Sequence, residues 1–228
     1  MEIQGDICCS IETWRSLVDH LTPDQCKKLA DFPGIHCMLE IPCIKMRFFL
    51  IQYMVEIYDS NRKRFVVQDK VGEISATTVD VECIYGLVNS GFNVAEILEE
   101  EGSGVNLIIP PHFKSTKTGN IVIQDLINDI IESGSCDDDF VRKTGLVLLG
   151  TVIAPHAVKV VPKVYYVLVQ DLDRLKELNL NEFTLLRLME NVTRVRSGKV
   201  MTQWPSGNLS LLQVNIIFLI HASIIVHI

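Results

Sequence analysis

The stretch that decides the fold is FVRKTGLVLLGTVI, residues 140–153, which follows Asp137-Asp138-Asp139 and ends just before Pro155. Apolar residues lie on nearly all sides of a helix with this sequence, and a helix without a polar face is buried inside a protein. The aspartates offer carboxylates to the free N–H groups of the first turn, and the proline cannot continue the helix. The stretch therefore predicts a central helix around which the rest of the chain packs.

Amphipathic helices are predicted on both sides of this centre. Before it, apolar residues recur at helical spacing from Ile123 and stop at Gly134. After it, a helix is expected from Val164, and a longer one is expected between the cap Asn179 and Gly198. The buried face of the longer helix should carry Leu185, Leu188, Met189, Val192 and Val195, with Glu190 and Arg194 paired on the opposite face.

The N-terminal part predicts three further helices. The first begins at Ser10, and the second begins with a capping box in which Thr22 precedes Pro23 and Gln25. The second helix should bury Cys26 and Leu29 and stop at Pro33-Gly34. A longer helix is expected from Pro42 to Tyr58, and Asp59-Ser60-Asn61 ends it.

A short hairpin interrupts the helices. Residues 64–68 are expected to form a strand, residues 69–72 a turn, and Glu73-Ile74 the return strand, after which Thr77 caps a helix that ends at Gly86. The fold class is therefore mainly α, a multi-helix globular domain with one short β-hairpin. The predicted core comprises Trp14, Leu17, Phe48, Ile51, Ile84, Leu126, Ile130, Leu146, Leu149, Leu188 and Val192.

The least regular segment, residues 86–117, suggests how the chain is divided. It contains the charged and glycine-rich run EEEGSG at residues 99–104, which is typical of a linker. Residues 1–104 are interpreted as an N-terminal helical half with the hairpin, and residues 105–213 as a C-terminal helical half of the same unit. Residues 214–228 form an apolar tail.

Composition limits the function classes. The chain has 228 residues, of which 48% are hydrophobic and 21% charged, and its net charge is −7. Such a composition is globular, and an acidic chain repels phosphate backbones, so no direct binding of nucleic acid is expected. The one basic cluster, Arg62-Lys63-Arg64, is interpreted as a solvated turn.

The cysteines indicate a reducing compartment. There are seven, an odd number, without a C-x-x-C pair, and the first residues do not resemble a signal peptide. We expect reduced, mostly buried thiols in a nuclear or cytoplasmic protein.

Motifs for chemistry are weak throughout. Residues 137–139 are interpreted as a helix cap rather than a magnesium site, and His36, Cys37 and Cys43 lack a second pair of zinc ligands. Lys117-Thr118-Gly119 is interpreted as a chance match to one short element of serine acyl-transfer enzymes, and residues 102–104 are not a phosphate-binding loop. We expect no enzyme activity, no catalytic, metal or cofactor-binding residue, and no small-molecule substrate. A cysteine–histidine pair assembled by the fold remains an alternative.

Four segments together resemble the aminotransferase-like plant mobile domain family. These are LVDHLTPDQCKKL (17–29) followed by MLEIPC, ISATTVDVECIYGLVNSG (74–91), the long run from Leu146 to Val192, and residues 207–213. Val88 and Leu180 depart from the family pattern, where proline and tryptophan are usual. The segments are structural motifs, and none carries the Schiff-base lysine or phosphate cradle of an aminotransferase.

The resemblance implies a transposon-derived domain. Members of that family include transposon products, and some act in nuclear silencing or development. The expected function is therefore a non-catalytic domain that binds other proteins, with a cryptic cysteine hydrolase or a tail-anchored membrane protein as alternatives. The membrane alternative rests on the apolar stretch Leu211–Ile228, which is long enough to span a bilayer but contains five polar residues. We expect instead that the tail after Gln213 is an altered end of the chain.

Overall fold

The computed structural model describes residues 10–67, 72–101, 107–156, 158–198, 204–215 and 217. Over these residues the chain is mainly helical, as the sequence predicts. Its helices are α1 (Ile11–Val18), α2 (Pro23–Leu29), α3 (Pro33–Leu39), α4 (Phe48–Ile57), α5 (Thr78–Tyr85), α6 (Val94–Glu100), α7 (Ile123–Ser133), α8 (Asp138–Leu148), the π-helix η1 (Leu149–Ile153), the 3-10 helix η2 (Lys163–Tyr165), α9 (Tyr166–Gln170), α10 (Leu172–Lys176) and α11 (Leu180–Arg196). Residues 209–215 are also helical.

The predicted central helix is confirmed as α8 followed directly by η1. Every residue from 144 to 154 is buried, and η1 packs against α1, α11 and the strand β5 (Val160–Val161). Gly150 permits the contact between η1 and β5, because a Cβ at this position would lie 2.7 Å from Val161 Cγ2. The close packing of η1 against β5 therefore requires a glycine at position 150, in the π-helical turn.

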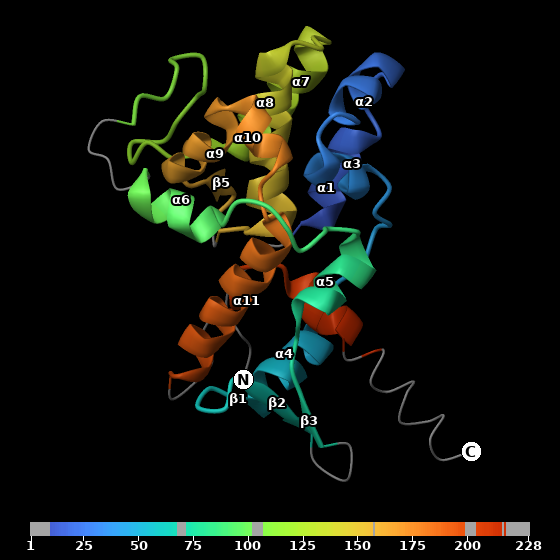
Figure 1. Cartoon of the computed structure of the whole chain (residues 1–228), viewed down its shortest axis with the longest axis vertical. Helices are drawn as coiled ribbons and strands as arrows, with labels where there is room; N and C mark the ends of the chain where they lie inside the picture. The colour runs from blue at the N-terminus through green and yellow to red at the C-terminus, as the bar shows by residue number, and fades with distance from the viewer. Residues whose placement is uncertain are drawn as a thin grey trace.

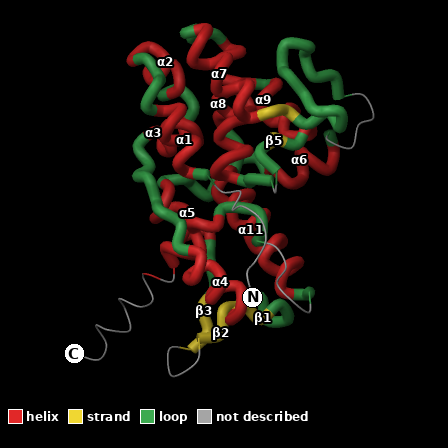
Figure 2. The backbone as a smooth tube through the Cα atoms, turned by 180° about the vertical axis from the view of Figure 1, so that it is seen from behind, coloured by secondary structure: helices red, strands yellow, loops and turns green. Residues whose placement is uncertain are grey.

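Helices from distant parts of the sequence cover this centre (Figure 1). In both views α1, α2 and α3 lie at one end of the molecule beside α7 and α8, whereas α4 and α5 lie towards the other end (Figures 1 and 2). The longest helix, α11, runs from the middle of the molecule towards the hairpin end and packs against α4, α5 and α6 (Figure 1). The buried apolar residues of both predicted halves belong to one hydrophobic cluster.

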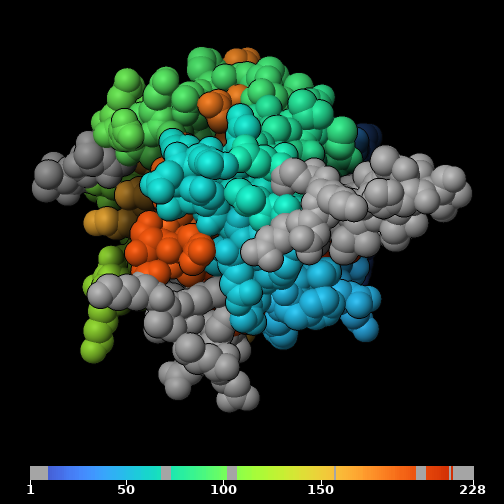
Figure 3. Space-filling view, turned by 90° about the horizontal axis from the view of Figure 1, so that it is seen from below, coloured from blue at the N-terminus to red at the C-terminus, as the bar shows by residue number. Residues whose placement is uncertain are grey.

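Two small antiparallel sheets accompany the helices. The predicted hairpin is β2 (Arg64–Val67) and β3 (Gly72–Ile74), and β1 (Tyr58–Asp59) adds a third strand on the other side of β2. A second sheet pairs β4 (Ile121–Val122) with β5. Figure 3 looks onto the hairpin end, where the last turns of α11 (orange) lie beside the hairpin (cyan). The Arg196 guanidinium donates there to the Tyr58 carbonyl at 3.1 Å.

The predicted caps are confirmed where the structure describes them. Ser10 caps α1, Thr22 and Gln25 form the capping box of α2, and Thr77 caps α5. Asp137 caps α8 by accepting from the Phe140 N–H at 2.8 Å. These contacts are local in sequence, which is why the sequence is enough to predict them.

Two helix boundaries in the N-terminal part are predicted wrongly. Pro33 begins α3 rather than ending α2, since proline is well suited to the first turn of a helix. Pro42 does not open a helix, because residues 41–47 have no regular secondary structure and α4 begins at Phe48. The reason is tertiary: the Gln213 amide accepts from the Arg47 N–H and donates to the Lys45 carbonyl at 2.8 Å. Helix α6 lies within the segment interpreted as a linker.

The predicted core is largely confirmed, with two exceptions. Phe48 is 55% exposed and lies against Trp204, with 5.5 Å between the ring centroids. Ile84 is only half-buried. In α2 the buried polar residue is Gln25, whose amide donates to the Ser135 carbonyl at 2.9 Å, whereas Cys26 is half-buried.

The tail lies mostly outside the described residues, which after residue 213 include only 214, 215 and 217. Among the residues that the structure describes, no helix is long and apolar enough to cross a membrane.

Candidate functional site

A large groove lies between α1, residues 44–48, the start of α7 and η1, and has a volume of about 610 Å³. Its lining combines apolar, hydroxyl and charged side chains. They are Ser10, Ile11, Glu12, Thr13, Ile44, Lys45, Met46, Phe48, Ile123, Gln124, Gly150, Thr151 and Lys159. A groove of this mixed composition offers both apolar contact and hydrogen bonds to a bound chain.

Two tertiary contacts shape the groove. One wall is the non-helical segment before α4, which is held by Gln213, whose side-chain amide contacts the backbone at Lys45 and Arg47. The floor is η1, where the Thr151 carbonyl accepts from the Ser10 N–H at 3.0 Å. Single π-helical turns within α-helices are frequent at functional sites.

An aromatic patch continues from the groove along α4. We define it as Phe48, Phe49, Tyr53 and Trp204. Phe49 is 64% exposed and Tyr53 is 39% exposed, and because they are four residues apart they lie on the same side of the helix. Phe48 lines the groove, so the patch and the groove form one continuous surface. Exposed aromatic side chains grouped in this way are typical of protein interfaces.

A second groove, of about 540 Å³, contains both a histidine and a cysteine. It lies between α1 and residues 40–43, and both His20 and Cys43 line it. The His20 ring contacts the Ser16 carbonyl through Nδ1 at 2.7 Å. Arg15 in the same groove donates to the Leu39 carbonyl at 2.6 Å and to Asp19 at 2.8 Å.

The neighbouring cysteine, Cys37, is not a nucleophile at neutral pH. Burial raises the pKa of its thiol to about 11, and the thiol lies 3.6 Å from the Gly34 carbonyl. The thiolate is the reactive form of cysteine, so this thiol is inert near pH 7.

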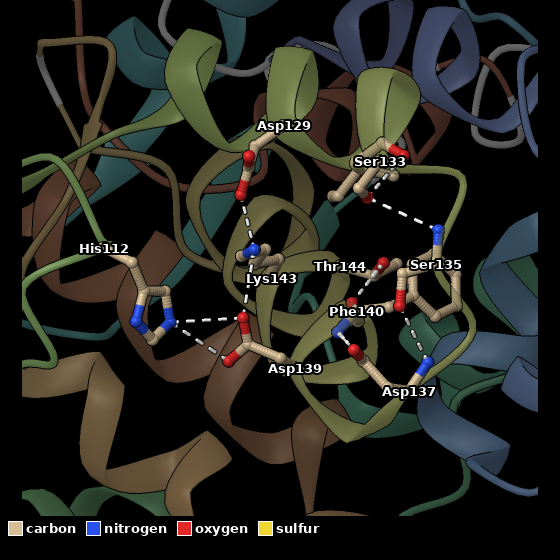
Figure 4. Close-up of polar contacts among 10 residues, drawn as sticks. His112, Asp129, Ser133, Ser135, Asp137, Asp139, Phe140, Lys143 and Thr144 are labelled. Carbon is tan, nitrogen blue, oxygen red and sulfur yellow. Dashed lines mark hydrogen bonds and ion pairs between the residues drawn. The ribbon is translucent and has the colours of Figure 1, made fainter.

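A charged cluster joins the loop at His112 to α7 and α8 (Figure 4). The Lys143 ammonium, on a side chain that is 13% exposed, lies between Asp129 and Asp139 and is 3.0 Å from the latter. His112 contacts the same Asp139 carboxylate, with Nε2 to Oδ2 at 3.1 Å. The Asp139 carboxylate therefore joins His112, in the loop, to Lys143, in α8.

The electrostatics of this cluster favour a structural role. Burial lowers the pKa of Lys143, but hydrogen bonds to Asp129 and Asp139 outweigh that effect and hold the pKa above its ordinary value. A lysine that keeps its proton cannot act as a base or nucleophile. The cluster therefore holds the loop against the two helices.

The aspartate triplet acts as the sequence predicts. Asp137 caps α8, and the Phe140 N–H is the main cause that lowers its pKa. Asp138 pairs with Lys28 at 3.2 Å, and Asp139 belongs to the charged cluster. The three carboxylates have separate partners. Among the residues that the structure describes, no group of histidine, cysteine or acidic side chains could hold a metal ion.

The other motifs also lie in structural positions. Arg62 and Arg64 both pair with Glu73 across the hairpin, and these two hydrogen bonds lower the pKa of Glu73. Lys117-Thr118-Gly119 lies in a turn in which the Gly119 N–H donates to the Thr116 carbonyl at 2.9 Å. Residues 102–104 lie outside the part of the chain that the structure describes.

The sequence reasoning missed the groove and the aromatic patch. The sequence pattern predicts Phe48 in the core, because this residue falls on the apolar stripe of a helix that begins at Pro42. A signal for the patch is the run RFFLIQY at residues 47–53, which places three aromatic residues within six positions.

Comparison with known proteins adds one finding. A family model described as a domain of unknown function, DUF8566, matches residues 7–213. No curated protein and no solved structure matches the chain.

Proposed function

We propose that this chain, which belongs to the DUF8566 family, is a non-catalytic domain that binds other proteins through the large groove and the aromatic patch. The observation that carries the proposal is the exposure of Phe49 and Tyr53 on α4, next to a groove of about 610 Å³. Burying aromatic side chains of this size supplies much of the energy of protein interfaces.

The partners of the charged groups also support a binding role. The aspartates, the basic hairpin and Lys143 are paired with one another or with backbone groups. The side chains considered for catalysis therefore already have structural partners. The apolar surface is for this reason the better candidate for function.

The finer assignment rests on the resemblance of the sequence to the aminotransferase-like plant mobile domain. That resemblance supports a transposon-derived interaction domain, nuclear or cytoplasmic, with a role in silencing or development. The partner would be a protein with an apolar segment that can enter the groove beside Phe48.

Site-specific photo-crosslinking tests the proposal. A benzophenone amino acid is placed at Phe49 in one protein and at Ile108 in another, because Ile108 is also exposed, at 78%, but does not line the groove. Both proteins are irradiated in extract of the source cells. We expect a discrete cross-linked partner from position 49 that position 108 does not give.

A competition arm makes this result decisive. A Phe49→Ser/Tyr53→Ser variant without the cross-linker should not compete for the partner, whereas an Ile108→Ser variant should compete as the unmodified chain does. Equal cross-linking from the two positions, or equal competition by the two variants, would contradict the proposal. Thermal melts of both variants check that each is folded.

One observation favours a second candidate, a cysteine hydrolase: His20 and Cys43 line the same groove. An activated Cys43 would react with iodoacetamide near neutral pH faster than a free cysteine does, and His20→Ala would slow that reaction. Reaction at the ordinary rate in both proteins would reject the hydrolase. Cys37 is the internal control, since its raised pKa keeps it unreactive in the folded chain.

A further inference from the structure

A second concave site, separate from the groove, lies between α11, η2 and the segment at residues 154–156. Its volume is about 330 Å³, at the lower end of the range of ligand pockets. The polar side chains that line it are His156, Tyr165, Arg187, Asn191, Arg194 and Ser206. The residues that line it include two arginines and no carboxylate, in a chain whose net charge is −7.

The sequence of α11 places the basic side chains together. Arg187, Asn191 and Arg194 are separated by four and three residues, so they lie on one face of the helix. The Asn191 amide donates to the Arg187 carbonyl at 2.7 Å and accepts from the Arg194 guanidinium at 2.9 Å. Asn191 therefore fixes the direction of the Arg194 side chain.

The opposite wall is built from buried groups. Tyr165 is 3% exposed, and burial raises the pKa of its phenol although the nearby Arg187 guanidinium acts to lower it. Ser206 is also buried, and the next residue, Gly207, has φ of +100° and lies so close to α11 that a Cβ would be 2.8 Å from Leu188 Cα. The backbone at 206–207 can thus approach the helix and close one side of the pocket.

One nearby carboxylate, that of Glu190, reduces the positive charge of the pocket. The sequence predicts that Glu190 pairs with Arg194, but the structure pairs it with Arg187 at 2.9 Å. Glu190 and Arg187 are both partly exposed, so this ion pair is weak in water. A guanidinium has five N–H donors, and the hydrogen bonds described here leave donors of both arginines for a ligand.

We propose that this pocket binds the phosphoryl group of a phosphate monoester. Two guanidinium groups match a group that carries about −1.5 to −2 charges at pH 7 and offers three acceptor oxygens. The small volume admits a phosphorylated side chain or a small organic phosphate. A carboxylate carries half the charge and binds more weakly, and the site is independent of the protein-binding groove.

Calorimetric titration of the full chain tests the site, with phenyl phosphate and inorganic phosphate as probes at constant ionic strength. We expect saturable binding that Arg194→Gln weakens by about tenfold or more, since a charged hydrogen bond is lost. Glu190→Gln should strengthen binding, because it removes the competing carboxylate. Arg64→Gln, an exposed arginine of the hairpin, is the matched control and should bind as the unmodified chain does.

The results also separate the two sources of the ligand. A phosphoserine peptide that binds more tightly than inorganic phosphate would indicate a phosphorylated protein, whereas equal affinity would indicate a small phosphate, and both results support the site. Binding that does not saturate, or that Arg194→Gln and Arg64→Gln weaken equally, would overturn it. Arg187→Gln is a second variant, and thermal melts show that each variant is folded.

Discussion

Replacing Gln213 by methionine isolates the contact that shapes the groove. Gln213 is 3% exposed, and its amide makes hydrogen bonds to the backbone of Arg47 and Lys45. Methionine is nearly isosteric, so the substitution keeps the packing and removes both hydrogen bonds. Each bond contributes about 0.5–1.5 kcal/mol, so the free energy of unfolding should fall by about 1–3 kcal/mol.

Two measurements check this prediction. In a chain of this size the loss corresponds to a decrease in Tm of roughly 2–12 °C, which calorimetry resolves, since 1 kcal/mol shifts Tm by about 2–4 °C. Hydrogen exchange of the Arg47 amide should accelerate, because its acceptor is gone. Gln170→Met, at an exposed position, is the control and should leave both quantities unchanged.

The reasoning fails if Gln213→Met changes the free energy of unfolding by less than about 0.5 kcal/mol, which is the range of ordinary surface substitutions. It also fails if the Arg47 amide exchanges at the same rate in both proteins. In that case the non-helical conformation of residues 41–47 would be set by their own sequence.

Three further predictions concern the core, the charged cluster and the tail. Leu149→Ala should lower the free energy of unfolding by about 2–5 kcal/mol in urea titrations, because the side chain is buried in the central cluster; less than about 1 kcal/mol would mean a poorly packed site. Lys143 has a raised folded pKa, so its contribution is present below the ordinary lysine pKa of about 10.4 and is lost as pH rises through the folded value. Unfolding titrations from pH 8 to 11 should therefore show a loss of stability that Lys143→Met lacks, and identical pH profiles would count against the ion pairs. The full chain should leave the membrane fraction on alkaline carbonate washing, as should a chain that ends at Gln213; retention of the full chain alone would establish a membrane anchor.

The local elements of the fold are predictable because their causes are local. Asp137 and Thr77 lie next to the N–H groups that they cap, and Gly134 adopts the positive φ of 59° that ends α7. Residues 140–153 are apolar on nearly all sides, which determines their burial whatever surrounds them. A helical fold with a hairpin near Arg64 follows from such features.

The errors occur where a distant residue decides the local structure. The backbone at residues 41–47 is not helical, because Gln213 contacts it at Arg47 from 166 positions along the chain, and so α4 begins at Phe48 and exposes that ring. Apolar periodicity alone cannot detect such a contact. It reports which face of a helix is buried, but it does not show which distant segment packs against that face.

The sequence by itself thus determined the class of the fold, the central helix and the caps, since these depend on residues within one or two turns of each other. Only the tertiary structure decided the aromatic patch, the groove and the pocket beside Arg187 and Arg194. Their residues come from elements that are far apart in the chain, and in the pocket Tyr165 and Ser206 lie beside residues of α11. A surface of this kind is created by the relative positions of packed elements, and those positions are set by the sum of many long-range contacts.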